Sequence, residues 1–214
     1  DWKLATAMPC AVYTPWHLIH TAGRIQEGDT VFFHAAAGTV PVVGAQIAKR
    51  AGARVLGACS SGEKADFAKR YGADEVFVTG EGDWVDFVKE ATDGRGVDLI
   101  IDGIAGPDAP RNIEALAPFG QAVYLGAIGG YAPPVDISKE LYMKSNAVRG
   151  FLVYVALRET GGSETPEIHD ALRDGSIQIP ITGVWKLDQV AELHRRFEDR
   201  QLIGKQLIEV AGEL

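Results

Sequence analysis

Cysteine is scarce in this sequence of 214 residues, and its scarcity narrows the class of protein. Only Cys10 and Cys59 occur, which is too few for a disulfide framework, so a reducing, cytoplasmic location is expected. An apolar run of the roughly 18–20 residues that a membrane span needs is also missing, and the first residues do not resemble a signal peptide. We therefore expect no membrane partner.

Positive charge is in deficit as well. The sequence has 21 Lys and Arg against 29 Asp and Glu, a net charge of −8. Nucleic acid is not an expected partner, because binding it requires cations that neutralise phosphate. The Gly-x-Ser-x-Gly elbow of α/β-hydrolases is absent, which removes their nucleophile. No initiator Met precedes Asp1, which indicates a fragment or a trimmed chain.

Short β-rich runs alternate with helical patterns from Asp29 onward. The alternation predicts an α/β fold, a doubly wound parallel sheet of the Rossmann type with right-handed crossovers. The expected strands are 31–34, 54–58, 75–78, 97–102 and 121–125, and a sixth from Ala147 to Tyr154. The expected helices are 40–51, 63–71, 83–92 and one from about residue 109.

The last part of the sequence follows a different pattern. We expect a helix that ends near Asp174 and pattern breaks at 179–180 and 182–183. Asp188 is then expected to cap a helix that runs through Arg200. The final strand, 205–210, has no helix after it, so we expect it to belong to another sheet.

The turn after the first strand is the most informative feature. In a dinucleotide fingerprint, three glycines serve the turn, the approach of the pyrophosphate and the packing of helix on strand. Those positions are Ala36, Gly38 and Pro41, so only the middle glycine is kept. A strand precedes the turn and a helix follows it, which favours a phosphate-binding helix N-terminus over a tight turn without ligand.

The tip of the second strand indicates which dinucleotide is bound. NAD sites carry an acid there for the ribose hydroxyls. This chain has Ser60, Ser61 and, one turn later, Lys64, groups that suit a 2′-phosphate. The alternative interpretation is that Ser61 only caps the second helix while Lys64 is solvated.

The loops after the fourth and fifth strands contain several glycines. They lie at the carboxyl edge of the sheet, where open α/β sheets bind ligands. Gly103, Leu125, Gly126 and Ala127 are therefore candidates for lining the ribose and nicotinamide. Ordinary turn chemistry is the competing explanation for these glycines.

A series of motifs occurs in order along the chain: His34-Ala-Ala-Ala-Gly38, Gly57-Ala-Cys-Ser-Ser61, Lys64, Gly72-Ala-Asp74, 94–102, Leu125-Gly126 and Arg200-x-x-x-Gly204-Lys205. This series resembles the quinone oxidoreductase (zeta-crystallin-like) branch of the medium-chain dehydrogenase/reductase superfamily. The resemblance implies NADPH as cofactor, no zinc, and hydride transfer to a small-molecule substrate, a quinone or an activated enone. It also implies a homodimer that pairs the strand from Ala147 to Tyr154 with its copy.

Relatives of this kind carry an N-terminal GroES-like barrel domain, and the resemblance implies that this sequence does not include it. The resemblance therefore implies a joining segment at 1–23 and a Rossmann domain at 24–155. It implies a C-terminal segment at 156–214, whose last part returns to the missing catalytic domain.

The chain departs from the family pattern in two places. The usual Gly-Gly-Val-Gly turn is Gly38-Thr39-Val40-Pro41 here, and a tyrosine that helps hold the 2′-phosphate in some members falls on Thr79. Thr14 matches a position that usually faces the nicotinamide, although it is equally an ordinary helix residue. The expected cofactor-binding residues are Thr14, Ala37, Gly38, Thr39, Val40, Ser60, Ser61, Lys64, Gly103, Leu125, Gly126 and Ala127.

Two other functions remain open. Cys10 matches the spacing at which zinc-dependent alcohol dehydrogenases place a metal ligand, but the further ligands that zinc needs would lie in the missing domain. His17 and His20 are nearby at a spacing that is not a recognisable zinc pattern. A non-catalytic NADPH-binding or dimerisation module is the third possibility. No residue is assigned as a catalytic acid or as a metal ligand.

Overall fold

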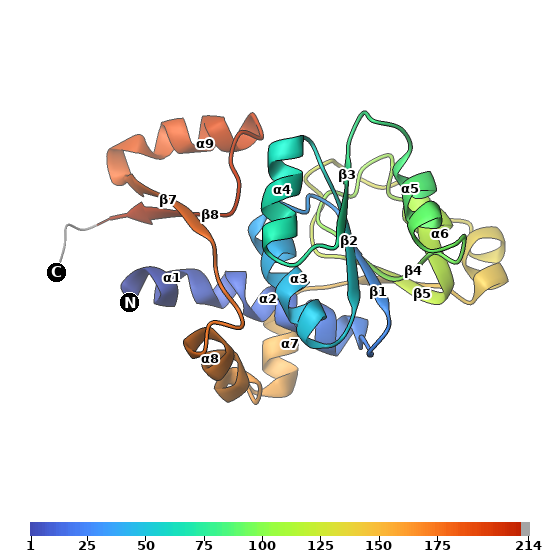
Figure 1. Cartoon of the computed structure of the whole chain (residues 1–214), viewed down its shortest axis with the longest axis horizontal. Helices are drawn as coiled ribbons and strands as arrows, with labels where there is room; N and C mark the ends of the chain where they lie inside the picture. The colour runs from blue at the N-terminus through green and yellow to red at the C-terminus, as the bar shows by residue number, and fades with distance from the viewer. Residues whose placement is uncertain (211–214) are drawn as a thin grey trace.

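A six-stranded sheet forms the centre of the molecule (Figure 1). The computed structural model describes residues 1–210. The strand order is β3-β2-β1-β4-β5-β6, and every neighbouring pair is parallel. The strands are β1 (Thr30–Phe33), β2 (Arg54–Cys59), β3 (Glu75–Val78), β4 (Val97–Asp102), β5 (Leu116–Tyr124) and β6 (Ala147–Gly150). This is the doubly wound order with its switch point between β1 and β4, so the expected Rossmann-type sheet is confirmed.

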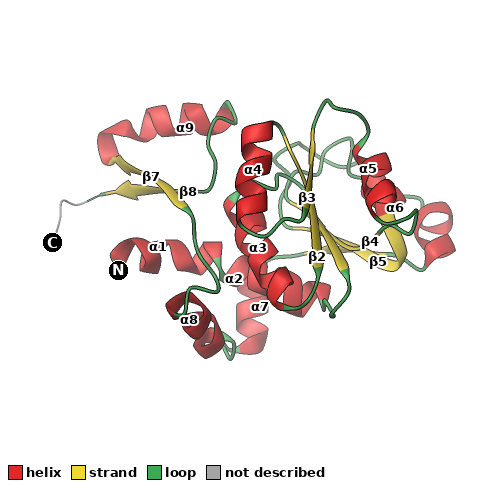
Figure 2. Cartoon of the chain, viewed as in Figure 1, coloured by secondary structure: helices red, strands yellow, loops and turns green. Residues whose placement is uncertain are grey.

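Helices cover both faces of this sheet (Figure 2). Residues of α3 (Thr39–Arg50) and α4 (Gly62–Arg70) pack on one face with the N-terminal helices. Residues of α5 (Trp84–Ala91) and α6 (Arg111–Ala115) pack on the other face. Strand β4 contributes Leu99 and Ile101 to the first layer and Ile100 to the second, all fully or almost fully buried. A strand between two layers needs this near-continuous apolar run.

The described chain has further helical segments. They are α1 (Trp2–Ala11), α2 (Tyr13–His17), the π-helical η1 (Leu18–Gly23) and η2 (Ile137–Leu141), the 3₁₀ turns η3 (Tyr142–Lys144) and η4 (Leu187–Gln189), α7 (Val153–Thr160), α8 (Thr165–Arg173) and α9 (Val190–Glu198). No helix of residues 1–210 is long and apolar enough to cross a bilayer.

A second sheet joins β7 (Ile181–Lys186) to β8 (Lys205–Glu209) in parallel. It lies beside α1 and α9, away from the central sheet (Figure 1). The expectation that the final strand belongs to another sheet is confirmed. The strand β7 was missed, because Gly183 was interpreted as a break. Any Cβ at Gly183 would collide with the Gln206 amide, which accepts a hydrogen bond from Trp185 Nε1 at 2.8 Å, so the glycine is part of the strand pairing.

Two expected elements are corrected by the structure. The strand predicted from Ala147 to Tyr154 ends at Gly150, because the chain turns at Leu152, the N-cap of α7; the Phe151 N–H makes the last bond to β5, to the Tyr124 carbonyl at 2.8 Å. The helix predicted from Asp188 through Arg200 spans only Val190–Glu198. Asp188 lies within the preceding 3₁₀ turn, and Arg200 has a left-handed φ of 56°, which a helix does not continue through.

Candidate functional site

The turn between β1 and α3 has the geometry of an anion-binding helix N-terminus. Gly38 is the N-cap of α3, and no side chain among the described residues caps this end of the helix. Gly38 has an ordinary extended φ of −74°, so glycine is not needed there for backbone strain. A Cβ would lie 3.2 Å from the Ala35 carbonyl, which is tight but not prohibitive. Its bare backbone therefore leaves the N-terminus open to an anionic ligand.

Close packing of α3 on β1 depends on Gly44, which sequence reasoning missed. A Cβ on Gly44 would lie 2.9 Å from the Phe33 ring and 3.3 Å from Pro15 Cβ. Gly57 serves the turn in the same way, because its Cβ would lie 2.7 Å from Ala36 Cβ. Gly44 and Gly57 thus allow the close packing that the third fingerprint glycine usually allows. Pro41, which occupies that third position, lies within the first turn of the helix, where proline is tolerated.

Ser60 and Lys64, two of the groups expected at a 2′-phosphate, lie together at the tip of β2. Lys64 Nζ lies 3.1 Å from Ser60 Oγ and also donates to the Arg200 carbonyl at 2.5 Å. Ser61 caps α4, since its Oγ accepts from the Lys64 N–H at 3.4 Å. Ser61 therefore caps the helix, as the alternative interpretation expects. Lys64, in contrast, makes hydrogen bonds within the protein and is not simply solvated. Burial raises the pKa of Cys59 at the end of this strand, and its thiol donates to the Ser61 carbonyl at 3.2 Å.

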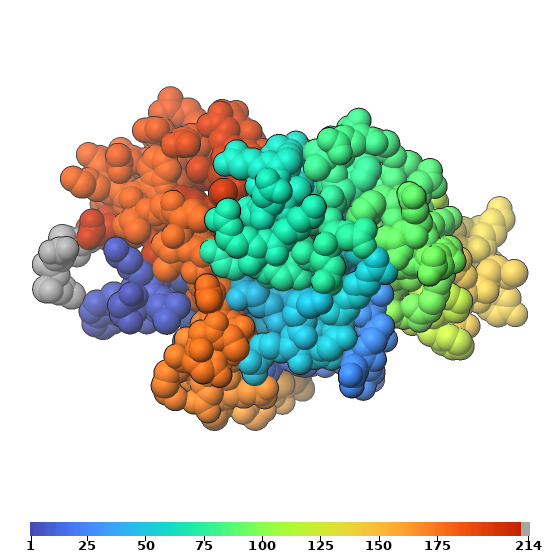
Figure 3. Space-filling view, viewed as in Figure 1, coloured from blue at the N-terminus to red at the C-terminus, as the bar shows by residue number. Residues whose placement is uncertain are grey.

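A segment near the C-terminus lies against both parts of this site. The Gly204 N–H donates to the Ala37 carbonyl at 3.1 Å, and Thr39 Oγ1 donates to the Gly204 carbonyl at 3.0 Å. Gly204 has a φ of 61°, and a Cβ there would lie 2.7 Å from the Pro180 carbonyl. Figure 3 shows this C-terminal part of the chain packed beside α4. The only sequence signal for the contact is the Arg200-x-x-x-Gly204-Lys205 motif.

The loops after β4 and β5 are held together by backbone hydrogen bonds. The Leu125 N–H donates to the Asp102 carbonyl at 3.0 Å, and the Gly129 N–H to the Ile104 carbonyl at 2.7 Å. A Cβ on Gly126 would lie 3.0 Å from the Gly103 carbonyl. Loop-to-loop packing thus bears on Gly126, whereas a Cβ on Gly103 would meet only the Leu125 side chain at 3.8 Å. A role of these residues in lining the ribose and nicotinamide stays a prediction, with turn chemistry as its alternative. Gly103 and Leu125 are half-buried, whereas Gly126 and Ala127 are exposed.

Thr14 and Cys10 lie on the N-terminal helices. Thr14 is buried in α2, with 9% of its surface exposed, and its approach to a nicotinamide stays a prediction. Cys10 is exposed on α1. Both ring nitrogens of His17 are engaged, by Thr21 Oγ1 at 2.9 Å and by Glu164 Oε1 at 3.1 Å. Within residues 1–210 no three His, Cys, Asp or Glu side chains are arranged to hold a metal ion.

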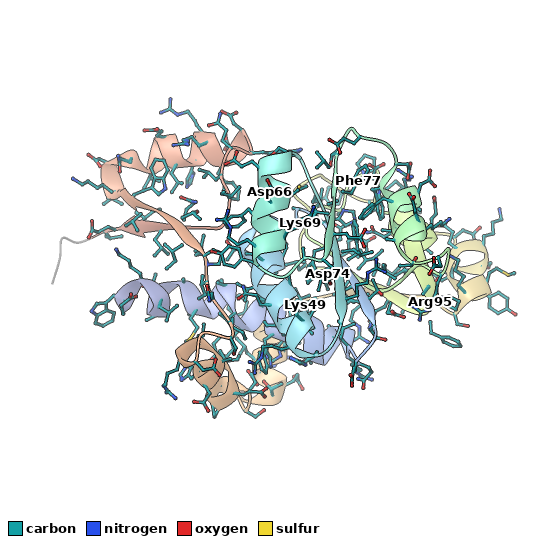
Figure 4. All side chains as sticks on the ribbon, viewed as in Figure 1. Lys49, Asp66, Lys69, Asp74, Phe77 and Arg95 are labelled. Carbon is teal, nitrogen blue, oxygen red and sulfur yellow. The ribbon has the colours of Figure 1, made fainter. Side chains whose placement is uncertain are left out.

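A cavity of about 490 Å³ lies elsewhere, at the C-terminal ends of α3 and α4. Lys49, Arg50 and Arg70 line it, and Lys49 is paired with Asp74 at 2.8 Å (Figure 4). Cations at helix C-termini complement the helix dipole, and none of the expected cofactor residues lines this cavity. It is separate from the candidate site.

Comparisons with known proteins agree with this geometry. The family model for zinc-binding dehydrogenases matches residues 40–170. The 2-haloacrylate reductase of a Burkholderia species is 28% identical over 199 residues, which cover 89% of this chain and 58% of that protein.

Solved structures of quinone oxidoreductases share the whole arrangement of the described chain. That of Pseudomonas syringae pv. Tomato DC3000 superposes with a TM-score of 0.90 at 25% identity, over 98% of this chain and 65% of the other. That of Escherichia coli, a complex with NADPH, gives 0.90 at 26% identity, over 98% and 66%. The chain thus spans about three fifths to two thirds of the length of these relatives, and the resemblance that its motifs indicate is confirmed.

Proposed function

The chain belongs to the zinc-binding dehydrogenase family, within its quinone oxidoreductase branch, and from that premise we propose that it is the NADPH-binding part of an oxidoreductase. The observation that carries the proposal is the pairing of an uncapped helix N-terminus at Gly38 with the Ser60–Lys64 contact at the tip of the neighbouring strand. The first suits a pyrophosphate and the second a 2′-phosphate, and both lie at the carboxyl ends of adjacent parallel strands.

Each expected residue has a role in this proposal. The backbone of Ala37, Gly38, Thr39 and Val40 would hold the pyrophosphate, because the N–H groups at a helix N-terminus attract anions. Ser60, Ser61 and Lys64 would hold the 2′-phosphate through hydroxyl groups and a charge-assisted contact. The residues Thr14, Gly103, Leu125, Gly126 and Ala127 would line the ribose and the nicotinamide.

When bound there, NADPH would supply a hydride to an electrophilic carbon of a quinone or an activated enone. The relatives named as quinone oxidoreductase and 2-haloacrylate reductase support this substrate class. The chain's own contribution is to bind and orient the cofactor at the edge of a rigid sheet. No residue is assigned as proton donor to the substrate.

The exposed outer edge of β6 supports a second proposal, that two copies of the chain pair there. Strand β6 is the last strand of the central sheet, and all four of its residues are exposed. Val148 is 42% exposed, and Leu152 and Tyr154 beyond it are 57% and 70% exposed. An unpaired apolar edge invites pairing with another strand, and a second copy would cover it.

Titration of the full chain with NADPH and NADH, followed by cofactor fluorescence, tests the cofactor assignment. We expect saturable binding with a clear preference for NADPH, because Lys64 favours the 2′-phosphate. Equal binding of both nucleotides would contradict the role of Ser60 and Lys64. Absence of binding by either would contradict the proposed function and favour a non-catalytic module.

A further inference from the structure

Four polar side chains form a connected group at the carboxyl ends of β1, β4 and β5, and we call them the Asn112 network: His34, Asp102, Asn112 and Tyr124. His34 begins the turn after β1, Asp102 ends β4, Asn112 belongs to α6, and Tyr124 ends β5. Asn112 Oδ1 lies 2.7 Å from His34 Nε2, and Asn112 Nδ2 lies 2.8 Å from Asp102 Oδ2 and 2.9 Å from the Tyr124 hydroxyl. Asn112 and Asp102 are only 1% and 2% exposed.

The chemistry of these groups fixes the direction of every hydrogen bond. A carboxylate only accepts, so the amide nitrogen of Asn112 must face Asp102. Burial raises the pKa of Tyr124, whose hydroxyl keeps its proton and donates to the Ala109 carbonyl at 2.9 Å. The carbonyl oxygen of Asn112 is left for His34, whose Nε2 must therefore carry a hydrogen.

The network joins the two loops on either side of the switch point. Asp102 Oδ1 accepts from the backbone N–H groups of Ile104 at 2.7 Å and Ala105 at 3.0 Å, which sets the course of the loop after β4. At the other end of the network, His34 is the first residue of the turn that leads to Gly38. Asn112 is the one side chain that bonds directly to both His34 and Asp102 within the described residues.

We propose that Asn112 is a positioning residue for NADPH, which holds the phosphate turn and the loop after β4 in register with each other. The inference rests on the proposed function and goes beyond it, since Asn112 is not among the expected cofactor-binding residues and would act through His34 and Asp102. Without the amide, buried Asp102 loses one of its three donors, and half-buried His34 loses its side-chain acceptor. Each loss removes a hydrogen bond that links Asn112 to one of the two loops, and the bond to Asp102 is fully buried.

The test compares Asn112→Leu with Asn146→Leu in the full chain. Asn146 is the control, since its amide nitrogen also donates two hydrogen bonds, here to the Ala117 and Gly120 carbonyls, in a different place near β6. We expect Asn112→Leu to weaken NADPH binding about tenfold, because one or two buried hydrogen bonds are lost, and Asn146→Leu to leave it unchanged. Circular dichroism verifies that both variants are folded.

Asn112→Asp gives a readout that a general loss of stability does not. It places a second carboxylate against Asp102, and two such groups share one proton only when the pH falls. Binding of NADP⁺, which is stable in acid, should be weak at pH 7.5 and recover toward pH 5 relative to the wild-type chain. This variant also decides the matter if Asn112→Leu does not fold.

Nitrogen-15 NMR of the His34 ring provides a measurement that does not involve the cofactor. We expect a hydrogen on Nε2 in the wild-type chain, and a hydrogen on Nδ1 alone would overturn the proposed direction of the network. If the wild-type chain binds NADPH and Asn112→Leu binds it equally tightly, this inference is overturned and the proposed function is not. A wild-type chain that binds no NADPH would overturn the proposed function and this inference with it.

Discussion

Lys64 illustrates how one side chain combines a local and a distant contact. Its bond to Ser60 is local, because the two residues are only four positions apart, and both are candidates for the 2′-phosphate from the sequence alone. Its bond to the Arg200 carbonyl joins positions 136 residues apart and depends on the fold. Thr39 behaves likewise, because its hydroxyl donates to Gly204, and only its backbone remains for a ligand.

Lys64→Ala should raise the dissociation constant of NADPH about tenfold and that of NADH little, because a charge-assisted contact to the 2′-phosphate is lost. Isothermal titration calorimetry of the full chain measures both constants. Lys69→Ala is the control, because Lys69 is exposed on the same helix and its substitution removes the same charge (Figure 4). An unchanged preference for NADPH in Lys64→Ala would refute the assigned role.

Helix α3 shows what happens to an element when its fingerprint is incomplete. The sequence keeps one glycine of three, and the pattern leaves open whether Pro41 separates the helix from the sheet. In the structure α3 remains closely packed, because the missing side chain of Gly44 leaves room for the Phe33 ring and that of Gly57 leaves room for Ala36. The contacts of these two glycines depend on which strand lies opposite, so the sequence pattern did not identify them.

Gly44→Ala should destabilise the chain, although alanine favours helices. The new Cβ would lie 2.9 Å from the Phe33 ring, and overpacking of this kind lowers the free energy of unfolding by about 1–3 kcal/mol. Gly62→Ala at the start of α4 is the matched control, because nothing lies within 4 Å of its added Cβ. Urea denaturation of both variants measures the difference, and equal stability would contradict the packing argument.

At the scale of the whole molecule, the edge strand β6 bears on how copies of the chain associate. Its four residues are exposed, and the chain leaves the sheet after Gly150, earlier than the sequence predicts. The surface that a second copy would cover thus consists of the short strand and the exposed side chains that follow it.

Val148→Lys should convert a homodimer into a monomer, because a buried and unpaired ammonium opposes pairing at the edge. Size-exclusion chromatography with light scattering measures the change from two chains to one. Val184→Lys, a change at a similarly exposed valine on β7, should leave the dimer intact. A wild-type chain that is already monomeric would exclude the proposed pairing.

The sequence by itself determined the central sheet, since apolar periodicity and turn residues are local properties that act wherever the chain folds. It also predicted candidate site residues from local patterns, Gly38 at the start of its helix and Ser60 with Lys64 at the tip of the second strand, and their binding of a cofactor stays a prediction. Only the tertiary structure decided the contacts between distant segments: Gly204 against the phosphate turn, β7 beside β8, and Asn112 between His34 and Asp102. Such contacts depend on which elements become neighbours in the fold, and the local patterns that predict helices and strands do not contain that information.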